Sequence, residues 1–150
     1  MYKKLLVPLD GSARAEVILP HVESLASSYE ATITLLGIVE PEQIMVMEPL
    51  QYPIDLQNQE RRAKEALNYL TSVQNRLTAK NLTVEVKVVE SPVVEGIIET
   101  ADEDETDLIM MVSHGRTGLA RVFYGSVAAG VLHGVNRPLM IIRSLEHQQK

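Results

Sequence analysis

The residues with the clearest chemical potential are Ser113-His114-Gly115-Arg116-Thr117-Gly118, together with Gly125-Ser126, which follow nine residues after Gly115. Glycines let backbone amides wrap around an anion. A serine at the start of a helix adds a hydroxyl beside unpaired N–H groups and the positive end of the helix dipole. Arg116 and His114 are further donors for phosphate oxygens. The pattern predicts a phosphate-binding site.

Each of these features also has a purely structural interpretation. The glycine segment is equally consistent with a plain loop in which Ser126 only caps its helix. Asp10 in Asp10-Gly11-Ser12 is either a turn residue or a ligand of a ribose hydroxyl or of magnesium-bound water. Neither a Walker A motif nor a Gly-x-Gly-x-x-Gly fingerprint occurs. The histidines His21, His133 and His147 lack metal-ligand spacing, so we expect no metal site.

Hydrophobic periodicity predicts the elements that must position these residues. A buried strand at 3–9 runs into the Asp10-Gly11-Ser12 turn, and further strands are expected at 31–39, 82–88, 108–112 and 139–142. Helices are expected at 15–26, 61–77, 94–101 and 126–135, the first with Ser12 as its N-cap and a bend at Pro20. Gly130 and Gly134 are expected to let the last helix pack closely on the sheet.

Strands that alternate with helices indicate βαβ units and right-handed crossovers. We therefore expect an α/β fold, a three-layer α/β/α sandwich with a five-stranded, mostly parallel sheet, in one domain over 1–150 with a variable loop at about 40–60. Ligands of such sheets bind beyond the carboxyl ends of the strands. This edge would hold Asp10, the residues after Ile38, and Ser113 onward.

Composition limits the function classes. Of the 150 residues, 45% are hydrophobic and 23% charged, which is typical of a folded globular chain. Without cysteine the fold needs no oxidising compartment, so we expect a cytoplasmic protein. A net charge of −6 argues against nucleic acid and acidic membranes as partners, and no apolar run approaches the roughly 20 residues of a membrane span. The acidic run 102–107 is interpreted as a solvated face.

Two motifs together resemble a known family. Val7-Pro8-Leu9-Asp10-Gly11-Ser12 at the first strand, with Ser113-His114-Gly115, nine residues and Gly125-Ser126, resembles the universal stress protein family. The ATP-binding branch of that family has Gly-x-x-Gly, nine residues, then Gly-Ser or Gly-Thr. In that register Val112 replaces the first glycine.

The resemblance implies an adenine nucleotide α-hydrolase-like fold that binds ATP, with or without magnesium. It implies that Pro8 and Asp10 flank the nucleoside, that the backbone near Ile38 reads adenine, and that the loop after the fourth strand holds ribose and phosphates. The residues carried over are Pro8, Asp10, Gly11, Ser12, Ile38, Val112, Ser113, His114, Gly115, Arg116, Thr117, Gly118, Gly125, Ser126 and Val127.

Three functions stay open at this point. The first is a nucleotide-dependent binding or signalling module with an unidentified protein partner, favoured because no base and nucleophile pair stands out, so we assign no catalytic residue. The second is an enzyme, in which Asp10 with magnesium and His114 support slow ATP hydrolysis or nucleotide transfer. The third is a family member that binds no nucleotide and acts by protein contacts. The resemblance also implies a homodimer through 138–143.

Overall fold

The structure, a computed structural model, describes residues 1–41, 56–113 and 125–144. The predicted loop residues His114, Gly115, Arg116, Thr117 and Gly118 lie outside these segments. The elements in chain order are β1 (Lys4–Pro8), the 3₁₀ helix η1 (Ala15–Ile18), α1 (Leu19–Tyr29), β2 (Thr32–Val39), α2 (Leu56–Thr78), β3 (Thr83–Glu90), α3 (Val93–Glu103), β4 (Leu108–Ser113), α4 (Ser126–Gly134) and β5 (Leu139–Arg143).

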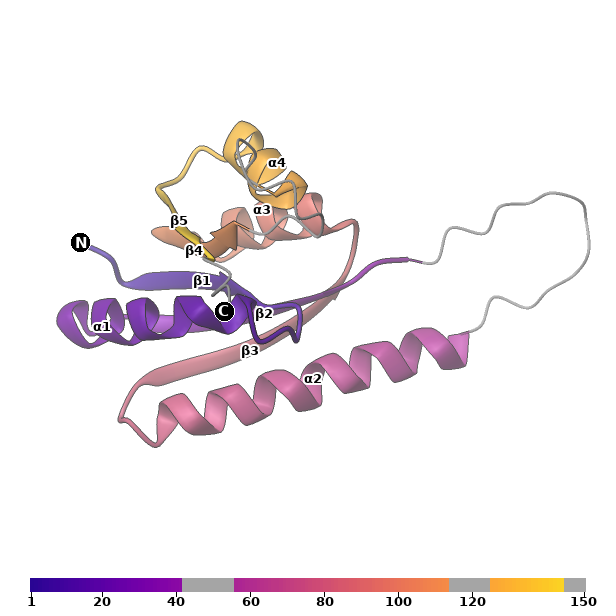
Figure 1. The fold of residues 1–150 in the computed structure, drawn as a ribbon, viewed down its shortest axis with the longest axis horizontal. Coiled ribbons are helices and arrows are strands. Elements are labelled where there is room, and N and C mark those ends of the chain that lie inside the picture. The colour runs from indigo at the N-terminus through magenta and orange to yellow at the C-terminus, as the bar shows by residue number, and fades with distance from the viewer. Residues whose placement is uncertain (42–55, 114–124, 145–150) are drawn as a thin grey trace, which may run out of the picture.

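The described strands form one five-stranded sheet in the order β3-β2-β1-β4-β5, with every neighbouring pair parallel. Helices α1 and α2 lie on one face, and α3 and α4 on the other (Figure 1). Side chains alternate between these faces. Leu5 and Val7 of β1 join the cluster under α1 and α2, whereas Leu6 joins the one under α3 and α4. The predicted three-layer α/β/α architecture is confirmed.

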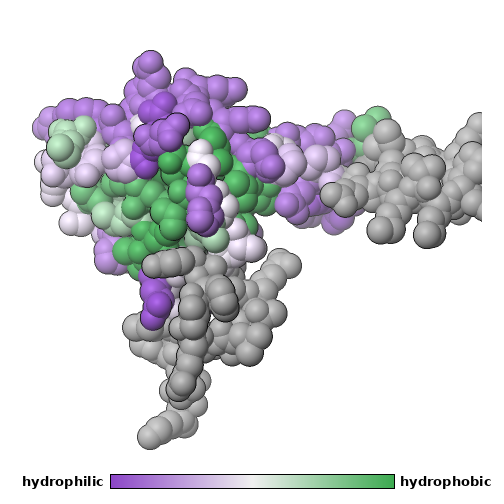
Figure 2. Space-filling view, turned by 90° about the horizontal axis from the view of Figure 1, so that it is seen from above, coloured by the Kyte–Doolittle hydropathy of each residue, from purple (hydrophilic) through white to green (hydrophobic). Residues whose placement is uncertain are grey.

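The two edge strands differ in character. β3 alternates apolar residues with Glu85 and Lys87 on its other face, as predicted for a strand near an edge. In β5 the apolar residues from Leu139 to Ile142 are all only partly buried. Figure 2 looks onto the side that carries α4 and β5 and shows an apolar area there between polar borders. In the described part of the chain, the β5 edge is therefore the apolar one.

The first helix departs from its prediction at Pro20. A 3₁₀ segment runs from Ala15 to Ile18, and the α-helix begins only at Leu19, which puts Pro20 in its first turn. The amide that proline lacks would have had no intrahelical partner there, so no bend is needed. The N-cap of η1 is Arg14, without a side-chain capping bond, so the prediction of Ser12 as the N-cap was wrong; the Ser12 Oγ still accepts a hydrogen bond from the amide of Ala15 at 3.2 Å.

Two further predictions were wrong in detail. α2 begins at Leu56, so the loop predicted over 40–60 was too long at its far end; residues 56–62 bury no side chain fully and carry no apolar period.

Gly130 and Gly134 face α3 and not the sheet. A Cβ at Gly130 would lie 2.8 Å from Val94 Cγ2, and one at Gly134 would lie 2.6 Å from Ile98 Cδ1. These glycines therefore let two helices touch.

Candidate functional site

The centre of the sheet contains a topological switch point between β1 and β4. From β1 the chain continues to helices on one face, and the next helix after β4, α4, lies on the other face. In open parallel sheets such divergence leaves a crevice beyond the strand ends. Pro8 ends β1, Ser113 ends β4, and Ile38 lies near the end of β2. The predicted residues at these strand ends therefore share one edge of the sheet.

The turn after β1 is held together by Asp10. Its Oδ1 accepts hydrogen bonds from the Ser12 amide at 2.9 Å and from the Ser12 hydroxyl at 2.6 Å. Gly11 between them has a φ of +84°, and a Cβ added there would meet nothing within 4 Å. A side chain at this residue would be strained by its backbone and not by its neighbours. Asp10 therefore has the role of a turn residue, which was one of the two interpretations of its carboxylate.

Ser126 does not cap α4, contrary to the structural interpretation of this residue. Gly125 is the N-cap, with φ −47° and ψ 153°, and no side-chain hydrogen bond caps the helix. Ser126 is the first helical residue and is exposed, followed by the partly buried Val127. The first amides of a helix have no intrahelical acceptor and lie at its positive end. Ser126 therefore presents its hydroxyl next to backbone donors that have no acceptor within the helix.

Ile38 and Val112 use their side chains in packing. Ile38 packs on the α3 face, where its Cδ1 would lie 3.1 Å from a Cβ built on Gly96. Val112 packs on the opposite face of the sheet, against the cluster beneath α1, and is paired in register with Ile142 of β5. Both residues therefore have only their backbone groups to offer to a ligand at the strand ends.

One titratable residue with a shifted pKa was not predicted from the sequence. Tyr69 of α2 packs against the cluster under α1 and α2. Burial, and then the carboxylates of Glu16 and Asp10, raise the pKa of its hydroxyl to about 12. Glu16 in turn forms an ion pair with Arg76 and raises the pKa of that guanidinium through their hydrogen bond. Tyr69 lies within the predicted helix 61–77 but belongs to no motif, so no sequence signal singled it out.

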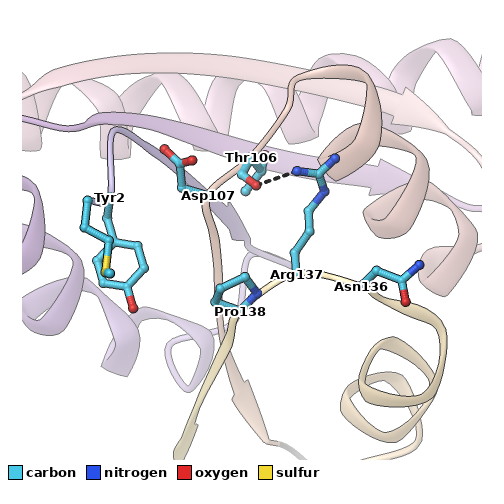
Figure 3. A pocket seen from close by; sticks show the side chains of 7 residues that line it. Tyr2, Thr106, Asp107, Asn136, Arg137 and Pro138 are labelled. Carbon is cyan, nitrogen blue, oxygen red and sulfur yellow. Dashed lines mark hydrogen bonds between the residues drawn. The ribbon is translucent and has the colours of Figure 1, made fainter.

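At the amino ends of the strands, opposite the candidate site, lies an open pocket of about 410 Å³, drawn in Figure 3. Arg137 there donates from Nη1 to the carbonyl of Thr106 at 2.8 Å and from Nε to Asp102 at 3.1 Å. Oδ2 of Asp107 accepts the amides of Lys3 and Lys4 at 2.8 and 2.9 Å. The residues that line the pocket are Met1, Tyr2, Thr106, Asp107, Asn136, Arg137 and Pro138.

These contacts correct part of the interpretation of 102–107 as a solvated face: three aspartates of the run have partners, while Glu103 and Glu105 are exposed as expected. Besides Asp102 and Asp107, Asp104 of the same run pairs with Lys87 Nζ of β3 at 2.6 Å and accepts Lys4 Nζ on its backbone carbonyl at 2.9 Å. The run contacts residues at the start of β1, in β3 and in the turn before β5. The carboxylates of Asp102, Asp104 and Asp107 connect these segments.

The described segments contain neither a cluster of metal ligands nor a helix fit to span a membrane. Over residues 1–41, 56–113 and 125–144, no group of three or more His, Cys, Asp or Glu side chains is arranged to hold a metal ion. None of the helices in those segments combines the length and apolarity that crossing a membrane requires.

Known proteins resemble the chain over most of its length. It is 26% identical to the universal stress protein MJ0577 of Methanocaldococcus jannaschii, over 95% of this chain and 96% of that protein. A solved structure of MJ0577 superimposes with a TM-score of 0.82 at 28% identity, covering 97% of this chain and 99% of the other. These neighbours confirm the adenine nucleotide α-hydrolase-like fold.

Two more distant structures are similar in fold. One is a universal stress protein in complex with cAMP, with a TM-score of 0.64 at 20% identity over 96% of this chain and 98% of the other. The second, the universal stress protein from Archaeoglobus fulgidus in complex with dAMP, has a TM-score of 0.67 at 19% identity over 94% and 98%. The model of the universal stress protein family matches residues 1–143. The chain therefore belongs to the universal stress protein family.

Proposed function

We propose that this protein is an adenine-nucleotide-binding module, with ATP as its ligand, and that the whole chain acts as one domain in the cytoplasm. The nucleotide lies across the switch point between β1 and β4. The observation that carries the proposal is the start of α4, where the exposed Ser126 follows Gly125 without any side-chain cap. A helix end of this kind has donors and a dipole that favour phosphate.

The turn after β1 supports the nucleoside end of the same site. Its shape depends on Gly11 in a left-handed conformation and on the Asp10 bonds to Ser12. The Asp10 carboxylate carries the charge suited to a ribose hydroxyl or to water on magnesium. Magnesium usually keeps several waters and binds through phosphates and one or two carboxylates, so it would arrive with the triphosphate and Asp10 would meet it through water.

Related proteins support the ligand class. Two universal stress proteins of the same fold have been solved with cAMP and with dAMP, both adenine nucleotides. The residues that we propose to hold ATP are Pro8, Asp10, Gly11, Ser12, Ile38, Val112, Ser113, His114, Gly115, Arg116, Thr117, Gly118, Gly125, Ser126 and Val127. We assign them binding roles only, and we expect phosphate release from ATP at the background rate.

Calorimetric titration with ATP and magnesium tests the proposal. Ser126→Ala removes a hydroxyl beside phosphate and should weaken binding about tenfold. Ser27→Ala, the same change at an exposed position of α1, is the matched control and should bind as the parent does. If the parent takes up no ATP, or if Ser126→Ala binds it unchanged, the proposed site is wrong.

We also propose that two copies pair through β5, over residues 138–143. The support is the partly exposed apolar strand at the end of the sheet. An edge of that kind needs covering. Met140→Lys should turn a dimer into a monomer in light scattering, while Thr83→Lys on the opposite edge strand should not. A parent protein of monomer mass at micromolar concentration would contradict the pairing.

A further inference from the structure

The end of β2 extends beyond the end of its neighbour β1. The two strands pair in register up to Pro8 and Leu36, and the Leu9 amide makes the last backbone bond of this ladder, to the carbonyl of Leu36 at 2.9 Å. β2 continues to Val39, and among the described strands only β3 lies beside this last part. Ile38 therefore lies where β2 has lost one of its two neighbours.

The backbone groups of Ile38 point to the side where β1 has ended. Along a strand, the N–H and C=O groups of successive residues point to alternate sides. The carbonyl of Leu36 accepts a bond from the β1 side, and that of Val39 accepts the Ser91 amide at 3.1 Å on the β3 side. Ile38 has the orientation of Leu36, and no described backbone group pairs with it on that side. One donor and one acceptor are left there for a ligand.

Helix α2 contacts this end of β2 from one face of the sheet. The two elements come close at Gly37, where a Cβ would lie 2.9 Å from Leu70 Cδ1 and 3.6 Å from Ala66 Cβ. Residues four apart lie on one side of a helix, so Arg62 continues this line toward the end of β2. The start of α2 lies on the side where β2 ends (Figure 1). Arg62 Nη1 donates to the carbonyl of Glu40 at 3.1 Å.

Arg62 differs from its neighbour Arg61 in its hydrogen-bond partners. Arg61 is exposed and donates to Asn58 and Glu65 within its own helix. Arg62 is partly buried and donates to a backbone group that lies 22 residues away in the sequence, two residues beyond Ile38. A guanidinium is always charged, and a charged donor makes a stronger hydrogen bond than a neutral one. This bond therefore connects α2 to the end of β2.

We propose that Arg62 is a positioning residue for the base end of the nucleotide site, which holds the end of β2 so that the Ile38 backbone meets adenine in register. The proposal rests on the proposed function. Adenine has an amino group that donates beside a ring nitrogen that accepts, so a backbone carbonyl and amide can bind both together. A displaced strand end weakens both bonds. Arg62 does not contact the nucleotide and acts through the Glu40 carbonyl.

Arg62→Met tests this role, because methionine keeps a long side chain and removes the donors. ATP should bind about fivefold more weakly in calorimetry, which corresponds to one ordinary hydrogen bond. The urea midpoint of unfolding should stay unchanged, since the bond lies at the surface. Arg61→Met, the same change one residue earlier, is the matched control and should bind ATP as the parent does. Arg62→Lys keeps a charged donor and should recover most of the affinity.

A second ligand shows whether the loss lies at the base. ATP whose 6-amino group carries two methyl groups has no hydrogen to donate to the Ile38 carbonyl. The parent should bind this analogue about tenfold more weakly than ATP. In Arg62→Met the preference should shrink to about twofold, because the bonds to the base are already displaced. A side chain that only stabilises the fold would lower both affinities by the same factor.

The outcomes distinguish this inference from the function on which it rests. If the parent binds ATP and Arg62→Met binds it equally well, or keeps the full preference over the methylated analogue, the positioning role is wrong and the proposed function stands. A parent that binds ATP and the analogue equally also overturns the inference. So does a urea midpoint that falls together with the affinity, because it shows a structural role. If the parent takes up no ATP, both are wrong.

Discussion

The two ends of the parallel sheet use their polar residues in different ways. At the amino end, Asp107, Arg137 and Asp104 all find partners within the protein. At the carboxyl end, Ser126 begins a helix that no side chain caps, and the Tyr69 hydroxyl is buried without a partner among the described residues. Among the described residues, the amino end pairs these polar groups within the protein, whereas the carboxyl end has donors without a described side-chain partner.

This difference distinguishes polar groups that stabilise the fold from polar groups that can bind a ligand. A polar group with a good internal partner stabilises the fold, and its removal should be seen in unfolding. A donor without one does not stabilise the fold, and when it is buried it costs free energy that a ligand's acceptor can offset. Substitutions at the amino end should therefore change stability and leave ATP binding alone, and those at the carboxyl end should mainly change binding.

The largest expected effect is on stability, at the amino end. Arg137→Ala removes two hydrogen bonds from a guanidinium whose side chain is 27% exposed, and should lower the free energy of unfolding by about 2 kcal/mol. The measurement is urea unfolding. Arg61→Ala, in an exposed pair with Glu65 within α2, is the control and should cost less than about 0.5 kcal/mol. Equal losses in the two variants would contradict the comparison, as would weaker ATP binding in Arg137→Ala.

The turn after β1 should show a mixed effect. Gly11→Ala forces an alanine to a φ of +84° in otherwise open space, which should cost about 1 kcal/mol of stability. ATP affinity should fall as well, because the turn presents Asp10. Calorimetry and urea unfolding on the same sample give both quantities. Unchanged ATP binding with the stability loss present would mean that the turn is only structural.

Asp10→Asn separates the two interpretations of Asp10. Asparagine keeps an oxygen for the Ser12 amide and hydroxyl but removes the charge, so stability should stay nearly constant. Binding of ATP with magnesium should weaken about threefold, since hydrogen bonds of charged groups are roughly twice as strong as neutral ones. Should the affinity not move, Asp10 is a turn residue and nothing more.

The smallest effect is a pH dependence at the amino end. Hydrogen bonds from the backbone amides of Lys3 and Lys4 lower the pKa of Asp107 below its usual value. The folded state therefore favours the carboxylate. The stabilisation is present above the ordinary pKa of about 4 and is lost as the pH falls through the lowered one. The stability difference between the parent and Asp107→Asn should shrink on acidification. A difference independent of pH would contradict this assignment.

The sheet was predictable because its central strands are buried on both faces, and such strands have continuous apolar sequences. The placement of Asp10 and Ser113 at one end of the sheet could be predicted because ligands of parallel sheets bind beyond the carboxyl ends of the strands. The start of α2 was not predictable, since residues 56–62 bury no side chain fully and so leave no apolar period.

Other details depended on contacts between distant segments. Gly130 and Gly134 indicated a close approach, but the sequence could not say that Val94 and Ile98 of α3 would be the neighbours. Gly125 and Ser126 are both good N-cap residues, so only the backbone angles decide between them. A carboxylate run such as 102–107 looks the same in sequence whether it faces water or ties strands together.

The central claim is that ATP binds at the carboxyl end of the sheet and not at the amino end. Backbone amide spectra of the nitrogen-labelled protein, recorded while ATP and magnesium are added, test it most directly. We predict shifts for the amides of Gly11, Ser12, Ser126 and Val127, with those of Lys3, Lys4 and Asp107 unmoved. Shifts confined to the amino end, or no shifts at saturating ATP, would contradict the account.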